Sequence, residues 1–245
     1  MAQDRFYSER PLVHQHIILI NIDELYGHEE IVQTQVEWLK ENLRKLGYFF
    51  RPILIAKHEN VILDGHHRVV ALKELGEEKG IKIIKIPCVE IEYLDNPEIT
   101  LGTWHPIYTG KGFFNFPDEI NKIGIEWKKV ELFSSDVLNN PEYGFTIKTD
   151  DGEYFSLKGT QQEIYKKFLN YFGSDLFDYA KTLDFAIQSV ETGTGKFALL
   201  RTRVTKQDVI ESAKSNKLFA PKTTRHILSF RYQDIKVPLD ALFQS

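Results

Sequence analysis

The segment Ile62-Leu63-Asp64-Gly65-His66-His67-Arg68 gathers a carboxylate, a glycine, two imidazoles and a guanidinium within seven positions. An apolar run precedes it, and residues 66–76 show helical periodicity. A helix that begins here turns its free backbone N–H groups and the positive end of its dipole toward a ligand. Gly65 permits close approach of the backbone, and Arg68 adds a planar charge suited to phosphate. We interpret the segment as an anion site; the alternative is a capping turn with incidental histidines.

A second carboxylate, Glu29, lies in Tyr26-Gly27-His28-Glu29-Glu30, just before a second predicted helix. A carboxylate near an acceptor hydroxyl can act as a general base. The spacing alone favours a plainer interpretation, since the helix dipole stabilises glutamate in a first turn.

A polar run, Pro221-Lys222-Thr223-Thr224-Arg225-His226, stands between apolar pairs. Two cations, an imidazole and two hydroxyls suit an anionic ligand such as a carboxylate or a phosphate. Trp104, in the loop-like Thr103-Trp104-His105-Pro106, is also open to a ligand role. The alternative for the polar run is a solvated turn.

Three conspicuous features indicate no site. Gly193-Thr194-Gly195-Lys196 lacks the first glycine of a phosphate-binding P-loop, and Phe197 stands where Ser or Thr is needed. Cys88 lies in an apolar strand and is predicted to be a core residue. Trp38 lies in the periodic helix and is predicted to be core as well.

The secondary-structure elements that position these residues are predicted from hydrophobic periodicity and from the positions of glycine and proline. Residues 32–46 carry an apolar stripe and end at Gly47, which predicts an amphipathic helix. Residues 52–56 and 61–63 predict a hairpin; residues 81–93 predict a strand that Pro87 places at an edge or a bulge. The strand, turn, helix and strand of this region suggest a βαβ unit. Further on we predict a hairpin at 143–157, helices at 160–172 and after 205, and a strand at 197–204.

The composition excludes several classes of protein. The chain has 245 residues, and its 31 Lys+Arg against 35 Asp+Glu give a net charge of −4, which argues against a duplex-DNA partner. The apolar stretch 17–20 is too short to span a bilayer, and the first residues lack a signal-peptide pattern. A single cysteine excludes an internal disulfide. We therefore expect a cytoplasmic protein with no nucleic-acid or membrane partner.

The segment Asp64-Gly65-His66-His67-Arg68 resembles the phosphate-binding turn of the ParB/sulfiredoxin superfamily. With 27–30, 102–106, 219–226 and the closing 235–243, the sequence is similar to the archaeal free L-serine kinases of that superfamily. The resemblance covers most of the first hundred residues and the last forty or so. Residues 113–195 align poorly.

This resemblance implies an α/β (α+β) fold in two domains. Residues 1–95 would form a ParB/sulfiredoxin-like nucleotide-binding domain with a mixed sheet. Residues 96–245 would form an α/β domain that completes the substrate pocket, with the active site in the cleft between the two. The implied reaction is phosphoryl transfer from ADP or ATP to the hydroxyl of free L-serine or a related hydroxy-amino acid, with Mg²⁺ accompanying the nucleotide.

The resemblance also assigns residues to roles. Glu29 and Asp64 match the catalytic carboxylates, with Asp64 close to Mg²⁺. Nucleotide binding falls to Gly65, His66, His67 and Arg68. Substrate binding falls to Trp104, Lys222, Thr223, Thr224, Arg225 and His226. His105 departs from the family, in which an aromatic residue is at least as familiar at this position.

Other functions remain as alternatives. One is a ParB-like nucleotide-dependent DNA-binding or regulatory protein, and another is a nucleotide-binding regulator without catalysis. A sulfiredoxin-like reductase is excluded because its turn needs a cysteine where this chain has Gly65-His66-His67. The sequence does not choose between ADP and ATP, nor between serine and threonine, because one methyl group is worth only about 1–3 kcal/mol in a pocket.

Overall fold

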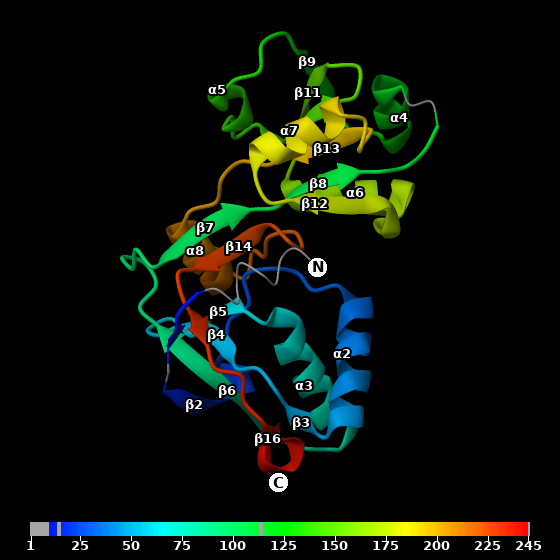
Figure 1. Ribbon diagram of the computed structural model, residues 1–245. Helices are drawn as coiled ribbons and strands as arrows, with labels where there is room; N and C mark the ends of the chain where they lie inside the picture. Colours follow the sequence, from blue (N-terminus) through cyan, green and yellow to red (C-terminus); the bar gives the residue numbers. More distant parts are fainter. Residues whose placement is uncertain (1–9, 14–15, 113–114, 245) are drawn as a thin grey trace. The chain divides into compact units, whose positions relative to one another are not determined.

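The computed structural model describes residues 10–13, 16–112 and 115–244 (Figure 1). The chain forms two compact units, which are described separately. Unit 1 comprises Met1–Leu101, Thr205–Pro221 and His226–Ser245, and unit 2 comprises Gly102–Val204 and Lys222–Arg225. This division differs from the expected boundary at residue 95. The chain returns to unit 1 after residue 204 because its last strands pair with strands of the first hundred residues.

Unit 1 is built on a mixed sheet flanked by helices. Its strands are β1 (Leu12–Val13), β2 (Ile17–Asn21), β3 (Tyr48–Phe49), β4 (Ile53–Ala56), β5 (Val61–Asp64), β6 (Ile83–Ile91), β15 (Arg231–Tyr232), β16 (Val237–Pro238) and β17 (Phe243–Gln244). Its helices are α2 (Gln33–Leu46), α3 (His66–Glu78) and α8 (Lys206–Ser215), with short 3-10 helices η1 (Ile22–Glu24) and η3 (Leu239–Ala241). The sheet order is β17-β6-β4-β5, and β2 pairs with β6. Strands β4 and β6 are parallel and the other pairs antiparallel, which confirms the expected mixed sheet.

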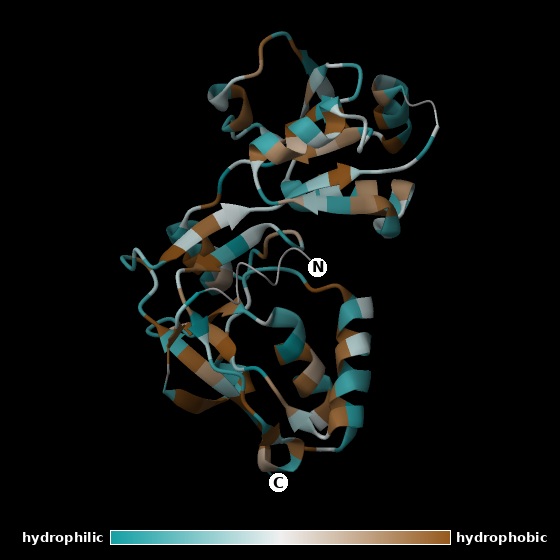
Figure 2. Ribbon diagram, viewed as in Figure 1, coloured by the Kyte–Doolittle hydropathy of each residue, from teal (hydrophilic) through white to brown (hydrophobic). Residues whose placement is uncertain are grey.

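Helix α2 follows the predicted stripe and ends at Gly47, whose φ of 71° is the left-handed conformation of a C-cap. Hydrophobic and hydrophilic bands alternate along it (Figure 2). Its buried residues Val36 and Leu43 join a core with Leu72 of α3 and Ile55 of β4. The prediction for Trp38 was wrong: this residue is 67% exposed, because it lies two positions from Val36 and thus on the opposite face of the helix.

The hairpin of β4 and β5 and the helix after it are confirmed, but two details differ. Because β5 is antiparallel to β4 and β4 is parallel to β6, α3 does not connect parallel neighbours, so the segment is not a βαβ unit. Strand β6 has three partners and is no edge strand. Pro87 falls between the residues of β6 that pair with β17 and those that pair with β4, where a missing N–H is tolerated.

Unit 2 is an antiparallel sheet with helices against it. Its strands are β8 (His105–Tyr108), β9 (Trp127–Val130), β10 (Tyr143–Thr149), β11 (Tyr154–Lys158), β12 (Phe177–Ala180) and β13 (Phe197–Leu200), in the order β12-β8-β13-β10-β11-β9. Its helices are α4 (Phe116–Ile123), α5 (Ser135–Leu138), α6 (Gln161–Phe172) and α7 (Leu183–Glu191), with the 3-10 helix η2 (Ser174–Leu176). Aromatic residues dominate the interior: Phe145, Phe155, Phe168 and Phe197 are at most 2% exposed.

Strands β7 (Ile99–Thr103) and β14 (Thr224–Leu228) pair with each other and carry the chain from one unit to the other. Both expected loops are therefore partly strand. Thr103 ends β7, His105 begins β8, and the polar run continues into β14 from Thr224 onward. β-Branched threonines suit this extended backbone. None of the described helices is long and apolar enough to cross a bilayer.

Candidate functional site

The amino end of α3 is open. Its N-cap is Gly65, at φ 112°, and no side chain caps the first turn. A Cβ at Gly65 would lie 2.5 Å from Ile53 Cδ1 and 2.9 Å from Arg68 Nη2, so only glycine fits. The first-turn amides and the helix dipole therefore present a positive end at this position, as the sequence predicts for an anion site.

Arg68 folds back over Gly65 and is only 12% exposed at its side chain. Its Nη1 donates to the carbonyls of Arg51 (2.7 Å) and Pro52 (2.9 Å), and its Nη2 donates to Asp64 Oδ2 (2.9 Å). The guanidinium thus joins the start of β4 to the end of β5. Its predicted contact with a nucleotide stays a prediction, since most of its donors already serve this structural role.

Asp64, at the end of β5, accepts hydrogen bonds from Arg68 and Tyr232 on the same oxygen. Tyr232 donates to the same Oδ2 at 2.8 Å, and the side chain is 48% exposed. Burial acts to raise the pKa of this carboxyl, but the charge of Arg68 and the bond from Tyr232 outweigh it and lower the pKa. Asp64 is therefore ionised at neutral pH.

The imidazoles of His66 and His67 accept hydrogen bonds from the backbone of a distant segment. The N–H of His28 donates to His66 Nε2 at 3.2 Å, and the N–H of Val32 donates to His67 Nε2 at 3.0 Å. Both imidazoles of the first turn of α3 therefore hold the segment that contains Glu29. No local sequence pattern indicates these bonds, because the bonded residues are 38 and 35 positions apart.

Glu29 lies in a fixed stretch of extended backbone. It forms a parallel bridge with Phe219, where the N–H of Glu30 donates to the carbonyl of Phe219 and the N–H of Phe219 donates to the carbonyl of His28. Its side chain is 12% exposed, with Oε1 4.0 Å from His28 Nε2. The backbone of Glu29 is therefore fixed, which suits a residue whose carboxylate must meet a hydroxyl in one geometry.

Three imidazoles pack edge to face behind this carboxylate. The His28 ring centroid lies 4.5 Å from that of His66 and 5.6 Å from that of His226. Burial lowers the pKa of His28 to about 4, against the opposing effect of its 2.8 Å hydrogen bond to the carbonyl of Ile62. Burial, with the neighbouring imidazoles, also lowers the pKa of His66 well below its ordinary value. The cluster is neutral at physiological pH.

His226 belongs to this cluster in unit 1, whereas residues 222–225 belong to unit 2. Its Nε2 lies 2.8 Å from the hydroxyl of Tyr93. Burial lowers the pKa of His226 to about 3, with a further lowering from His28, so its ring carries no charge at neutral pH. Lys206 in turn holds the Tyr93 segment through bonds from its ammonium to the carbonyls of Tyr93 (2.9 Å) and Asn96 (2.7 Å).

A metal site with three or more His, Cys, Asp or Glu ligands does not occur among the described residues. A magnesium ion that accompanies a nucleotide needs less, since it takes one or two carboxylates, the phosphates and water. The ionised and half-exposed Asp64 fits that donor set.

In unit 2, Trp104 lies beside the polar run. The backbone N–H of Trp104 donates to the carbonyl of Thr223 at 3.4 Å. The guanidinium of Arg225 lies 5.2 Å from the centre of the Trp104 ring. Lys222 has a left-handed φ of 55°, and its ammonium lies 4.3 Å from the ring of Tyr179. Burial lowers the pKa of Lys222. Thr223 and Thr224 are buried, which excludes the alternative of a solvated turn.

Sequence reasoning missed Arg201, which is 1% exposed. Its Nη1 donates to the carbonyl of Lys222 (3.0 Å) and to the hydroxyl of Thr223 (2.5 Å), and its guanidinium stacks on the ring of Tyr165 at 5.0 Å. The available signal was a charge directly after the apolar strand Phe197–Leu200. Tyr232 and Tyr93 of unit 1 gave no sequence signal at all.

His105, where the sequence departs from the family pattern, is buried in unit 2. Its Nδ1 accepts the backbone N–H of Arg201 at 3.2 Å. Burial, together with the charge of Arg201, lowers the pKa of His105 to about 4. The residue thus supports the Arg201 backbone from the interior of the unit. Burial also raises the pKa of Cys88 to about 12, consistent with the predicted core residue.

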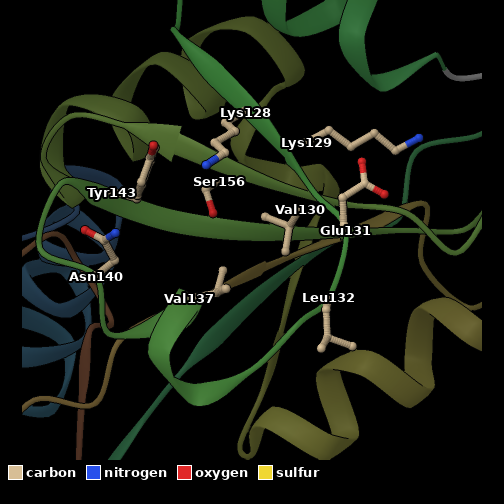
Figure 3. Close-up of a pocket in the computed structure, with 9 residues that line it drawn as sticks. All are labelled: Lys128, Lys129, Val130, Glu131, Leu132, Val137, Asn140, Tyr143 and Ser156. Atoms are coloured by element: carbon tan, nitrogen blue, oxygen red, sulfur yellow. The ribbon is translucent and has the colours of Figure 1, made fainter.

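A cavity of about 270 Å³ lies elsewhere in unit 2, between β9–β11 and α5. Its lining includes Lys128, Val130, Val137, Tyr143 and Ser156, and none of the predicted site residues. Figure 3 shows the residues that line it, with Val130 and Val137 among them. It has no part in the chemistry considered below.

The close fit at Gly65 leads to a stability prediction. Gly65→Ala is expected to cost about 1–3 kcal/mol of unfolding free energy, because the new Cβ overlaps Ile53 and Arg68 at a positive φ. Denaturant titration measures the loss. Gly80→Ala is the matched control, since Gly80 has a φ of 72° and no atom within 4 Å of its Cβ position. Equal losses in the two variants would show that packing at Gly65 is unimportant.

The lowered histidine pKa values predict acid sensitivity. Below pH 6.5 the unfolded chain takes up protons on His28, His105 and His226, while the folded chain does not until about pH 4 or 3. Stability is therefore complete above pH 6.5 and falls as the pH falls, by up to about 1.4 kcal/mol per pH unit for each histidine. Denaturant titrations at pH 7.5, 6 and 5 measure this slope.

A single substitution isolates one of these histidines. His105→Asn keeps an acceptor near the N–H of Arg201 but cannot be protonated, so the slope should decrease by about 1.4 kcal/mol per pH unit. His58→Gln, at a side chain that is 67% exposed, serves as the control and should leave the slope unchanged. A stability that is flat between pH 7.5 and 5 would contradict the prediction.

Solved structures share this fold over nearly the whole chain. A free serine kinase in complex with AMP is 26% identical, with a TM-score of 0.81 over 96% of this chain and 97% of the other. A variant of a free serine kinase in complex with ADP has a TM-score of 0.82 at 26% identity, with the same coverage. The protein therefore has the fold of the free serine kinases.

Sequence comparison carries the relationship further, although no protein-family model matches the chain. The "ATP-dependent L-serine kinase" of Staphylothermus marinus is 34% identical over 95% of this chain and 93% of its own length. The "ADP-dependent L-serine kinase SerK" of Thermococcus kodakarensis is 29% identical over 92% of this chain and 93% of its own length. A "ParB-like protein" of Sulfolobus acidocaldarius is 27% identical over 84% of the chain and 88% of its own length. The chain belongs to the L-serine kinase family.

Proposed function

We propose that this protein transfers the terminal phosphoryl group of ATP or ADP to the hydroxyl of free L-serine and releases O-phospho-L-serine. The identity to an ATP-dependent L-serine kinase over 95% of the chain supports this reaction. The observation in unit 1 that carries the proposal is the attachment of the Glu29 segment to the first turn of the uncapped helix α3. The first turn of α3 thereby carries the predicted anion site and also holds the segment that contains Glu29.

The nucleotide phosphates bind at the amino end of α3 in this proposal. The amides after Gly65 donate to phosphate oxygens, and the helix dipole stabilises their charge. The complexes of free serine kinases with AMP and ADP support a nucleotide site in this fold. Phosphoryl transfer depends mainly on such positioning and electrostatic stabilisation.

Glu29 acts as the general base. The serine hydroxyl oxygen forms a bond to the terminal phosphorus, and its proton passes to the Glu29 carboxylate. The bond between that phosphorus and the bridging oxygen breaks, and ADP leaves when ATP is the donor, or AMP when ADP is the donor. The side chain of Glu29 is 12% exposed, so water is largely excluded from it.

Residues of unit 2 bind the amino acid. Lys222 and Arg225 supply positive charge for the serine carboxylate, and Trp104 borders the same segment. Arg201 fixes the backbone and hydroxyl that join these cations. His226, which belongs to unit 1, adds no charge, since burial lowers its pKa to about 3.

Asp64 is the residue proposed to hold Mg²⁺ with the nucleotide. Its lowered pKa and its half-exposed side chain suit a hard cation. When bound, the ion would offset the negative charge of the phosphates. Arg68 and Tyr232 keep the carboxylate ionised and oriented whether or not the ion is present.

One assay tests the proposal. The protein is mixed with Mg²⁺ and either ATP or ADP, and each donor is crossed with L-serine, L-threonine and L-homoserine. We expect O-phosphoserine as the main product with at least one donor, detected by mass spectrometry. The relatives carry names with either donor, so both arms are needed. No phosphorylated product in any arm would refute the kinase assignment.

The second candidate is a ParB-like nucleotide-dependent DNA-binding or regulatory protein, favoured by the ParB-like relative. The net charge of −4 argues against it, because DNA affinity comes mainly from basic residues. A gel shift with duplex DNA at physiological salt, together with failure of the kinase assay, would favour this candidate.

A further inference from the structure

We propose that His66 and His67 are positioning residues whose Nε2 atoms hold the Glu29 segment and do not contact the nucleotide. The inference rests on the proposed function, in which Glu29 is the base. It reassigns two residues whose place beside Gly65 suggests phosphate contact.

The hydrogen bonds enclose Glu29 on both sides. His66 Nε2 accepts the N–H of His28, one residue before Glu29, at 3.2 Å. His67 Nε2 accepts the N–H of Val32, three residues after it, at 3.0 Å. Two consecutive residues of α3 thus bind the two ends of a single short segment.

These bonds fix the state of both rings. A backbone N–H can donate only to a ring nitrogen that carries no proton, so Nε2 of each imidazole is an acceptor and the proton lies on Nδ1. An Nε2 in this state cannot donate to a phosphate oxygen. The burial of His66 and its edge-to-face contact with His28 restrict the ring further.

The segment depends on these two imidazoles because its N–H groups at His28 and Val32 donate to them. Val32 is the N-cap of α2 and its side chain caps nothing. On the other side the backbone of Glu29 forms its bridge with Phe219. Loss of an imidazole would leave a backbone N–H without its acceptor and release one end of the segment. Displacement of a base by about 1 Å can reduce a rate by about 10²-fold.

The arrangement also explains why both functions lie in one turn. The backbone amides of the first turn of α3 face the phosphates in the proposed function, while its side chains hold the base. The distance between the base and the phosphorus it serves is then set by one helix end, without a flexible connection.

The test compares His67→Leu with His67→Gln. Leucine removes the acceptor, whereas the glutamine Oε1 reaches about as far as Nε2 and can accept the same N–H. We expect His67→Leu to lower kcat on the order of 10- to 100-fold and to change the Kd for ADP, measured by calorimetry, by less than about twofold. His67→Gln should recover most of the lost kcat, and His58→Leu should match the wild type.

Three outcomes would overturn the inference: a Kd for ADP that rises in His67→Leu as strongly as kcat falls, an unchanged kcat, or a glutamine variant no better than leucine. If the leucine variant does not fold, His67→Asn replaces it, since its oxygen is too short to reach the N–H of Val32. Absence of activity in the wild type would refute the proposed function instead, so the two failures are distinguishable.

Discussion

A Glu29→Gln variant is expected to lose between about 10² and 10⁴ in kcat while its nucleotide affinity stays nearly unchanged. Glutamine has the size of glutamate but cannot take the proton of the serine hydroxyl. The backbone of residue 29 is held by Phe219 and its neighbours by α3, so the substitution should leave the segment in place. Steady-state kinetics with serine, together with calorimetry with ADP, measures both quantities.

The neighbouring Glu30 provides the control. Its side chain is exposed, and Glu30→Gln should retain wild-type kcat. If Glu29→Gln instead weakened nucleotide binding in proportion to kcat, Glu29 would be a structural residue. If it kept full activity, another group would be the base.

An Asp64→Asn variant is expected to lose roughly 10²-fold or more in kcat/KM for the nucleotide, with an altered Mg²⁺ dependence. Asparagine removes the negative charge offered to the cation. It also leaves the guanidinium of Arg68, whose side chain is only 12% exposed, without its carboxylate partner. Activity measured over a range of Mg²⁺ concentrations, at saturating serine, reveals the change.

Tyr232→Phe separates the two effects of that substitution. It removes the hydrogen bond to Asp64 Oδ2 and leaves the charge in place. We expect a small loss of activity and an unchanged Mg²⁺ dependence. An Asp64→Asn enzyme whose Mg²⁺ curve matches the wild type would exclude a metal role for Asp64.

Local signals predicted the elements around the site well. The helix that ends at Gly47, the hairpin of β4 and β5, and the capping box of Thr205 and Asp208 all occur as expected. Each depends on residues a few positions apart, whose side chains and backbone meet whatever the rest of the chain does. Pro87 was misjudged because strand order depends on distant partners. Trp38 was misjudged although its spacing of two residues from Val36 already places it off the buried face of the helix.

The sequence predicted which residue types lie at the candidate site. It predicted less well which residues they contact. The positive φ of Gly65 and the start of α3 follow from the sequence around residue 65. The division of residues 221–226 between two units does not, because it depends on where β14 pairs. Arg201 was missed for the same reason: its role exists only through its contacts with Lys222 and Thr223.

By itself, the sequence determined which side chains are available for phosphoryl transfer and the secondary structure that carries them. Only the tertiary structure decided what each side chain binds. It turned Arg68 inward, set His66 and His67 against the Glu29 segment, and left Asp64 half-exposed. The physical reason is the separation along the chain. Helix caps and turns form between near neighbours, whereas the hydrogen bonds of Arg68, His66 and His67 to the backbone join residues 16 to 38 positions apart and require the folded core.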